Sequence, residues 1–259
     1  MIHARFDIGR RKCEADLNRP IDISVPLSPE GPRAWYVDKM KITPVRTAQF
    51  TGSVAEGGGV NFRDIFFNPH GHGTHTETVG HIDREITSVN AVVRNFFFPA
   101  LLITVSPAKS DGTETPEAAP GDLIIGENHM PLREKLTGFE ALVVRTLPNT
   151  RERLSRNYSN TNPAYFSPEA LLHLRKAGIR HLLTDLPSVD REEDGGALRA
   201  HRAFWKSGLP GDAEATITEF IFVPDTAEDG PYLLNLQTAP FENDASPSRP
   251  VLFPVRFTD

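Results

Sequence analysis

Residues 167–185 read SPEALLHLRKAGIRHLLTD, and this stretch decides the fold class. Ser167 is a favourable N-cap residue, and Pro168 suits the first position of a helix. Leucines at helical spacing follow, and Gly178 is a residue that can end the helix. The apolar character of residues 179–185 then predicts a buried strand directly after it. The stretch therefore indicates helices and buried strands that alternate along the chain.

The same combination extends to the rest of the chain. A second helix is expected over residues 197–206, where Gly208 follows and ends it. Five further segments have the apolar or alternating pattern of strands. They are residues 21–26 (IDISVP), 60–67 (VNFRDIFF), 97–105, 139–145 and 216–223 (TITEFIFV). Strands with a few helices between them predict a mixed, layered α/β fold.

Composition narrows the class of protein. With 259 residues and 39% apolar side chains the chain can form a sizeable core, and residues 1–259 are expected to form a single domain. The net charge of -6 is spread along the chain, which disfavours a nucleic-acid or membrane surface. Cys13 is the only cysteine, and no apolar run has the length of a signal peptide or a membrane span. A soluble cytoplasmic protein is therefore expected.

Residues 70–81 read HGHGTHTETVGH and contain four of the nine histidines of the chain. Imidazole nitrogens and carboxylate oxygens are common ligands of zinc and similar divalent metals. The glycines of the run disfavour a helix, so its spacing is interpreted as strand or turn. Residues two apart share a face of a strand, so His75 and Glu77 can bind one ion. His81 follows Gly80, where it can stand over the metal without binding it.

The first histidine of the site is left open by this pattern. Glycines before His75 allow the backbone to fold back, which brings either His70 or His72 to the same point. The alternative for the whole run is a polar surface loop whose imidazoles bond to their neighbours. Four histidines and an interleaved glutamate in so short a run favour the metal site.

Two ligands that are close in sequence cannot complete a tetrahedral shell, so others must come from elsewhere. His201 lies on the second expected helix. Glu219 stands in an otherwise apolar strand, where a carboxylate is costly unless it is paired or metal-bound; its alternative is a strand-edge glutamate that faces water. A cupin motif also contains His-x-His and a glutamate, but its preceding glycine falls at Asp64 here, and the helical region 167–206 fits a jelly roll poorly.

The segment GTHTETVGH resembles the signature His-x-Gly-Thr-His-x-Asp-x-Pro-x-His of the metal-dependent cyclase family, which includes bacterial kynurenine formamidase and isatin hydrolase. The resemblance continues over most of the chain and implies the swivelling β/β/α arrangement of that family. The other matching segments are IDISVPL (21–27), FEALVVRT (139–146), the stretch from SPEAL to PSVD (167–190), His201, TITEFIF (216–222) and PSRPV (247–251).

Three positions depart from the family signature. Glu77 stands in place of an aspartate, which keeps the charge and lengthens the side chain by one methylene, and Val79 replaces a proline. Gly71 occupies the place of the first metal histidine. Either His70 takes that role through a one-residue insertion, or His72 takes it with altered geometry. His70 is preferred because the Asn-Pro before it leads into the motif much as in the family, and the changes indicate a divergent subfamily.

The resemblance implies a divalent metal, zinc or manganese, and a hydrolytic activity. On this resemblance, a hydroxide held by the metal would attack the carbonyl of a small amide, formamide or cyclic amide, and His81 would act as general base and acid. The alternative for His81 is a further metal ligand. The implied metal ligands are His70, His75, Glu77, His201 and Glu219.

The resemblance also implies a homodimer or higher homo-oligomer. A non-catalytic protein that binds a small ligand on the same scaffold is the alternative function. Asp185 and Asp190 are expected to hold loop geometry, since aspartate next to proline and serine often forms turns. Trp35, Tyr36 and Phe62 are candidate aromatic walls of a substrate pocket, although core packing explains each of them as well.

Overall fold

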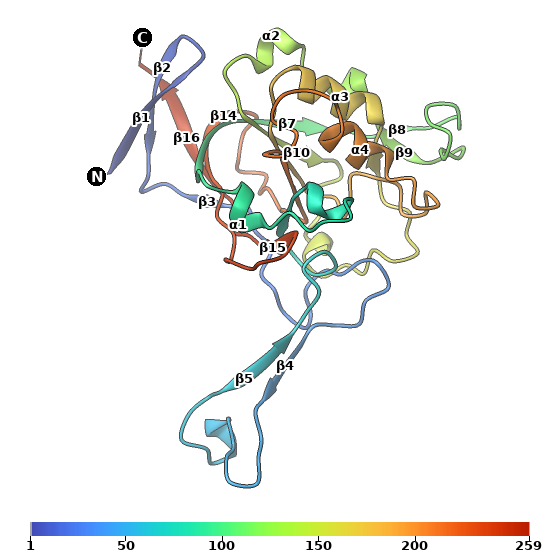
Figure 1. Ribbon diagram of the computed structural model, residues 1–259. Coiled ribbons are helices and arrows are strands. Elements are labelled where there is room, and N and C mark those ends of the chain that lie inside the picture. Colours follow the sequence, from blue (N-terminus) through green and yellow to red (C-terminus); the bar gives the residue numbers. More distant parts are fainter. Residues whose placement is uncertain (1, 259) are drawn as a thin grey trace.

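The computed structural model describes residues 2–258. Its main feature is an 11-stranded mixed sheet that runs through the body of the molecule (Figure 1). β3 (Ile21–Asp22) lies off the main order of the sheet and pairs with β16 (Val251–Phe257). The other strands, in spatial order, are β1 (His3–Ile8), β2 (Arg11–Asp16), β16 (Val251–Phe257), β14 (Gly230–Asn235), β7 (Phe97–Val105), β10 (Ala141–Thr146), β12 (His181–Thr184), β13 (Thr216–Glu219), β6 (His75–Glu77) and β15 (Ala245–Pro247).

Two smaller sheets and a few helices complete the described part of the chain. The small sheets consist of β11 (Tyr165–Phe166), β9 (Leu123–Ile125) and β8 (Ala108–Lys109), and of β4 (Lys41–Pro44) with β5 (Arg63–Phe66). The α-helices are α1 (Val89–Val92), α2 (Arg133–Leu136), α3 (Pro168–Lys176) and α4 (Arg199–Trp205). Short 3-10 turns are η1 (Val54–Glu56), η2 (Val79–His81), η3 (Glu127–His129) and η4 (Arg151–Leu154).

The centre of the large sheet is parallel and is buried on both faces. β7, β10, β12 and β13 run parallel to one another, whereas β14 pairs antiparallel with β7 and β6 pairs antiparallel with β13. Leu142 of β10 packs in the same core as Leu171 of α3, whereas Val143 packs with Leu234 in a second core. Burial on both faces explains why the sequence of β10 is continuously apolar and not alternating.

These elements confirm the prediction of a mixed α/β fold. The helix after Ser167 is confirmed with its N-cap, because the Ser167 Oγ accepts a hydrogen bond from the Ala170 N–H at 3.3 Å. Gly178 ends it in the left-handed region, with a φ of 93°. The strand over residues 97–105 is confirmed as β7. The second helix is confirmed as α4, although it is shorter than expected at both ends.

Two expected strands are shorter than the sequence indicates. Of residues 21–26, only Ile21–Asp22 forms a strand; further on, the Val25 N–H donates to the Thr74 side chain at 2.7 Å, outside any strand pairing. Of residues 216–223, only Thr216–Glu219 does so. Phe220 has a φ of 56°, a left-handed backbone that cannot continue a strand.

The segment predicted as a strand over residues 60–67 forms β5 in an unexpected place. β4 and β5 pair only with each other among the described strands. Together with the loop between them they project from the body as a long arm (Figure 1). The end of β5, at Phe66, lies shortly before the histidine run in the chain.

Candidate metal centre

The centre of the site is strand β6, all three residues of which are buried. Strand alternation places His75 and Glu77 on one face, as expected from their spacing. β6 pairs antiparallel with β13, and the register sets His75 directly opposite Glu219. Residues opposite each other in a sheet have neighbouring side chains. The His75 Nε2 consequently lies 3.4 Å from the Glu219 Oε2.

Glu219 is only 3% exposed, so it does not face water at a strand edge. That alternative is wrong because β6 covers β13 on the side away from β12. The carboxylate also accepts a hydrogen bond from the Val189 N–H at 3.2 Å. Glu219 is therefore a buried carboxylate that lies beside a buried imidazole.

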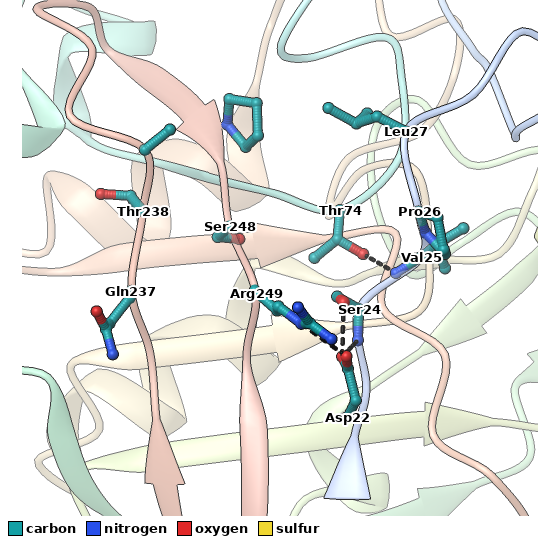
Figure 2. A pocket seen from close by; sticks show the side chains of 12 residues that line it. Asp22, Ser24, Val25, Pro26, Leu27, Thr74, Gln237, Thr238, Ser248 and Arg249 are labelled. Carbon is teal, nitrogen blue, oxygen red and sulfur yellow. Dashed lines mark hydrogen bonds and ion pairs between the residues drawn. The ribbon is translucent and has the colours of Figure 1, made fainter.

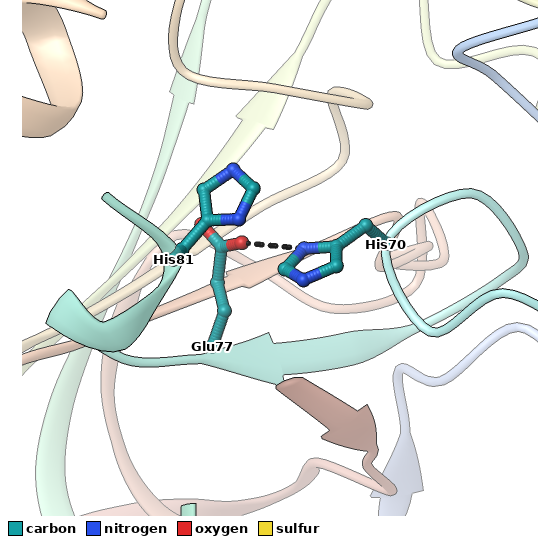
Figure 3. Close-up of side chains that lie close together, drawn as sticks. All are labelled: His70, Glu77 and His81. Carbon is teal, nitrogen blue, oxygen red and sulfur yellow. Dashed lines mark hydrogen bonds and ion pairs between the residues drawn. The ribbon is translucent and has the colours of Figure 1, made fainter. Parts of the chain in front are cut away.

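His70 and His81 approach Glu77 from the two ends of β6 (Figure 3). The His70 Nδ1 donates to the Glu77 Oε2 at 2.9 Å. His81 lies in the η2 turn, and its ring stacks on that of His70 with the centroids 4.2 Å apart. Gly80 permits this tight turn, because a β carbon there would lie 2.4 Å from the Thr87 backbone nitrogen.

His201 reaches the same carboxylate from helix α4. Its Nε2 lies 3.1 Å from the Glu77 Oε1, and its Nδ1 lies 2.5 Å from the Asp190 Oδ2. Asp190 also accepts hydrogen bonds from the backbone N–H groups of Ala200 and His201 at the start of α4. Asp190 therefore fixes both the start of helix α4 and the orientation of the His201 imidazole ring. This is a larger role than the loop geometry expected of it. Asp185 has a structural role, since it accepts from the Thr146 N–H and Oγ1.

Asp244 is a member of the cluster that the sequence did not indicate. Its Oδ2 lies 2.9 Å from the His70 Nε2 and 3.5 Å from the His81 Nδ1. It directly precedes β15, the strand that pairs with β6 on the side opposite β13. No spacing in the sequence connects Asp244 with the histidine run, so only the pairing of β15 with β6 could have revealed it.

The structure separates the two candidates for the first histidine. His70 lies in the cluster, whereas His72 is buried beside the root of the arm. The His72 Nδ1 accepts from the Asn68 N–H at 2.9 Å, and its Nε2 donates to the Asp38 carbonyl oxygen at 2.8 Å. All six residues expected at the site lie together: His70, His75, Glu77, His81, His201 and Glu219.

The donor set fits a divalent metal. His70, Glu77 and His81 each offer a ligand atom within 4.8 Å of the others, and so do His75, Glu77 and Glu219. Glu77 belongs to both groups. The His75 Nε2 is buried and has no hydrogen-bond partner among residues 2–258, as expected of a nitrogen that serves as a metal ligand. Mixed imidazole and carboxylate sets of this kind suit zinc-type ions.

The buried carboxylates of the cluster require positive charge beside them. Burial disfavours the charged form of Glu77, but His81, His201 and His70 offset it and hold the pKa of Glu77 well below its usual value. Burial and the Glu77 charge raise the pKa of Glu219. Hydrogen bonds to Asp244 and Glu77 outweigh burial and raise the pKa of His70 to about 10. Without a metal, protonated histidines neutralise the negative charge of these carboxylates. A bound divalent ion can neutralise the same charge, and the histidines then lose their protons.

A cavity of about 370 Å³ opens onto the cluster. Trp35, Val37 and Leu198 form apolar parts of its wall, and Ser188 contributes a hydroxyl group. Of the three aromatic residues expected to line a pocket, Trp35 does so. Tyr36 is 58% exposed and Phe62 is 58% exposed on the arm, so neither is a wall of this cavity.

A larger cavity of about 580 Å³ lies beside Thr74, the residue that precedes β6 (Figure 2). Its charged side chains, Asp22 and Arg249, bond to each other at 2.8 Å. No histidine lines it. The smaller cavity is therefore the one with the chemistry of an active site.

The fold and the cluster define a mixed α/β protein with a candidate divalent-metal centre. The model of the putative cyclase family matches residues 21–191. The chain is 30% identical over 245 residues to a kynurenine formamidase of Bacillus cereus and to one of Bacillus thuringiensis, with 91% of this chain and 97% of each relative covered. The chain belongs to the putative cyclase family, as its sequence motifs predict.

Solved structures agree on the fold. Isatin hydrolase A from Labrenzia aggregata, bound to benzyl benzoate, superposes with a TM-score of 0.63 at 16% identity, over 91% of this chain and 93% of that one. A protein described as a potential metal-dependent hydrolase with cyclase activity gives a TM-score of 0.62 at 16% identity, over 91% and 97%.

Proposed function

We propose that this protein is a metal-dependent hydrolase that cleaves the C–N bond of a small amide or formamide, with zinc or manganese as the metal. The observation that carries the proposal is the position of Glu77, which belongs to both groups of candidate ligands. The proposed metal ligands are His70, His75, Glu77 and Glu219 from these groups, together with His201, whose Nε2 lies 3.1 Å from the Glu77 Oε1. His81, the remaining group member, is a further ligand only in the alternative to its proposed role as a base. Two groups that share a carboxylate can hold one ion or two.

The relatives support this class of enzyme. Relatives with 30% identity are named kynurenine formamidase, and a structural neighbour is an isatin hydrolase bound to the product analogue thioisatinate. Formamides and cyclic amides both contain a C–N bond that is not a peptide bond. The chain is accordingly a hydrolase of such bonds, and the alternative of a non-catalytic binding protein is not favoured.

A divalent ion at these residues would supply a nucleophilic water near neutral pH and polarise the substrate carbonyl. His81 is the proposed general base and acid, since its side chain is 30% exposed beside the cavity. Asp244 contacts the Nδ1 of this ring, which leaves the Nε2 available to carry a proton to the leaving amine. Asp190 holds the His201 ring so that its Nε2 points at Glu77.

The cavity supports an aryl amide or a cyclic aryl amide as substrate. Its volume of about 370 Å³ suits a small molecule. Trp35 and Leu198 offer an apolar surface next to the cluster, where a planar ring can lie while its amide group faces His81. Both residues have a left-handed backbone, with φ of 58° and 48°. Such strained conformations concentrate at functional sites.

Metal content and hydrolysis test the proposal together. Purified protein is expected to carry about one or two divalent ions per chain and to hydrolyse N-formylkynurenine or isatin. His75→Ala should lose both properties, whereas His3→Ala, in strand β1 outside the cluster, should keep both. A folded wild-type protein that contains no divalent metal after expression in supplemented medium would contradict the proposal.

Three further expectations from the sequence stay predictions. They are a cytoplasmic location, a homo-oligomeric state and the absence of nucleic-acid partners. Within residues 2–258, no helix has the length and apolar character needed to cross a membrane.

A further inference from the structure

The cavity at the metal cluster has two walls that come from separate parts of the chain. Trp35 and Val37 form one wall, which we name the tryptophan wall. Residues 188–198, which lead into helix α4, form the other and are named the loop wall. The two walls are distant in the sequence, so contacts between them determine the width of the cavity. Glu192 of the loop wall makes such contacts.

The carboxylate of Glu192 bridges the two walls. Its oxygens accept hydrogen bonds from the three successive backbone N–H groups of residues 160–162, at 2.5–3.1 Å. Successive N–H groups that converge in this way form a nest, which favours an anion. The Oε1 also accepts from the Tyr36 hydroxyl group at 3.3 Å. Tyr36 stands between Trp35 and Val37 in the chain, so this bond reaches the tryptophan wall directly.

The tryptophan wall has a strained backbone that needs such support. Trp35 and Tyr36 are both left-handed, with φ of 58° and 60°, and neither is a glycine. Strained conformations of this kind persist only where the surrounding structure holds them. The Tyr36 N–H donates to the Ser159 Oγ at 2.9 Å, and its hydroxyl group donates to Glu192. Ser159 directly precedes the N–H groups that bind Glu192, so both supports of Tyr36 depend on this carboxylate.

Backbone hydrogen bonds also join the tryptophan wall to the turn of residues 156–162. The Tyr158 N–H donates to the Arg33 carbonyl oxygen at 2.7 Å, and the Arg33 N–H donates to that of Arg156 at 3.0 Å. Arg33 lies two residues before Trp35. Because of these bonds, a carboxylate that fixes the turn also fixes the wall.

The loop wall is itself anchored to the body of the molecule. The Nε of Arg191, the neighbour of Glu192, donates to the Asp122 Oδ2 at 2.8 Å. Asp122 is only 4% exposed and also accepts from the Tyr165 hydroxyl group at 2.9 Å. Glu192 is therefore held from its own side of the cavity, and its carboxylate supports the wall on the other side.

We infer, on the basis of the proposed hydrolysis, that Glu192 is a positioning residue that fixes the two walls of the cavity and thereby sets the affinity for the substrate ring. It acts through Tyr36 and the turn 156–162. A wall that occupied its binding position only about a tenth of the time would lower the apparent affinity about 10-fold. The reacting groups at Glu77 and His81 are left in place.

Kinetics of Glu192→Gln test this role. The amide keeps the size of the side chain, but it has a single oxygen and turns an NH₂ group against the N–H groups of the nest. The KM for an aryl formamide should rise about 10-fold, while kcat and metal content stay at the wild-type level. Tyr36→Phe removes one bond of the four and should raise KM about 2–3-fold. Glu152→Gln makes the same change at an exposed residue of η4 and should leave KM unchanged.

Hydrogen exchange of the backbone gives a measurement that needs no turnover. In Glu192→Gln, exchange should become faster both in the turn, residues 157–162, and in residues 33–38 of the tryptophan wall. Faster exchange in the turn alone would show that Glu192 only caps the turn, which overturns the inference. Because no substrate is involved, this result decides the role of Glu192 even if the protein is not a hydrolase.

Two kinetic outcomes would also overturn the inference. A lower kcat with loss of metal would mean that Glu192 acts on the metal cluster. A higher KM with wild-type exchange in residues 33–38 would mean that Glu192 contacts the substrate itself. If Glu192→Gln does not fold, Tyr36→Phe decides the matter alone, since Tyr36 is 58% exposed and loses only a hydroxyl group. An unchanged KM and unchanged exchange in that variant would then refute the role.

Discussion

Glu77 and His201 are 124 residues apart in the chain, and the Glu77 Oε1 lies 3.1 Å from the His201 Nε2. The other oxygen of the same carboxylate lies 2.9 Å from the His70 Nδ1. One buried glutamate thus connects a loop, a strand and a helix that come from distant parts of the sequence. Replacement of this residue should affect the whole centre at once.

Glu77→Gln keeps the shape of the side chain and removes its charge. We expect the variant to lose bound metal and to hydrolyse its substrate at least about 100-fold more slowly, because a metal ion contributes several kcal/mol to such reactions. Metal analysis and kcat/KM on the same preparation measure the effect. Glu85→Gln changes an exposed glutamate and should match the wild type. Full metal content in Glu77→Gln would refute the shared role of this carboxylate.

Asp190→Asn tests how the His201 ring is held. Asp190 accepts from the His201 Nδ1 at 2.5 Å, and hydrogen bonds to this charged imidazole keep the pKa of Asp190 below its usual value despite burial. Loss of such a partner typically lowers metal affinity or activity by about 10–100-fold. Chelator competition and kcat/KM should both show this decrease. Asp83→Asn, which removes an exposed partner of Lys206 next to α4, should show neither.

A comparison of His70→Ala with His72→Ala separates the two candidates for the first ligand. His70→Ala should lose metal and activity, because its Nδ1 lies at Glu77. His72→Ala should keep the metal but lower the free energy of unfolding by about 1–3 kcal/mol, since Asp38 and Asn68 lose a buried hydrogen-bond partner. Denaturant unfolding and metal analysis distinguish the two. The reverse assignment would follow if only His72→Ala lost the metal.

Much of the site could be predicted where ligands share one short segment. The pairing of His75 with Glu77 follows from strand spacing. The cost of a carboxylate in an apolar strand points to Glu219 but leaves open a strand edge that faces water, which only the pairing of β6 with β13 excludes. His201 required the order of motifs in the family. Asp244 could not be predicted, because its place depends on the pairing of β15 with β6.

Prediction of the fold from the sequence was limited in the same way, because pairing between distant strands is not visible in the sequence. Apolar patterns located the strands and helices but not their partners in space. The pattern of residues 60–67 indicated a strand, which is correct for β5. Its sequence does not reveal that β5 pairs only with β4 and stands away from the body, since an apolar residue on an arm looks the same as one in a core. The choice of His70 over His72 likewise depends on how the chain turns at the root of the arm.

The pH dependence of stability should contain a contribution from His181. Burial, together with the charges of Arg180 and Arg175, lowers the pKa of His181 to about 3, and its Nδ1 is 2.8 Å from the Thr216 Oγ1. The unfolded chain therefore binds this proton first as the pH falls below 6.5, and stability is lost between pH 6.5 and 3. The contribution to the free energy of unfolding between pH 7 and 5 is about 2 kcal/mol.

His181→Gln keeps a hydrogen-bond partner for Thr216 but cannot titrate. In urea unfolding of the chelator-treated protein, the wild type should lose about 2 kcal/mol more than this variant between pH 7 and 5. Removal of the metal beforehand excludes the pH dependence of metal binding. Equal losses for the two proteins would show that His181 is not held neutral in the fold.

Trp35 should determine which substrates fit. It has a left-handed backbone, with a φ of 58°, and its side chain lines the cavity together with Val37. Trp35→Ala is expected to raise KM for an aryl formamide about 10-fold or more, since the lost apolar contact is worth about 1.5–3 kcal/mol. The kcat should change little, because the cluster at Glu77 and His81 is untouched.

A small aliphatic formamide serves as the internal control for Trp35→Ala, because it has no ring to contact the indole. Its KM should be the same for the variant and the wild type. Trp35→Phe, which keeps an aromatic surface, should recover most of the affinity for the aryl substrate. A rise in KM of equal size for both substrates would mean that Trp35 shapes the cavity as a whole and does not contact the substrate ring.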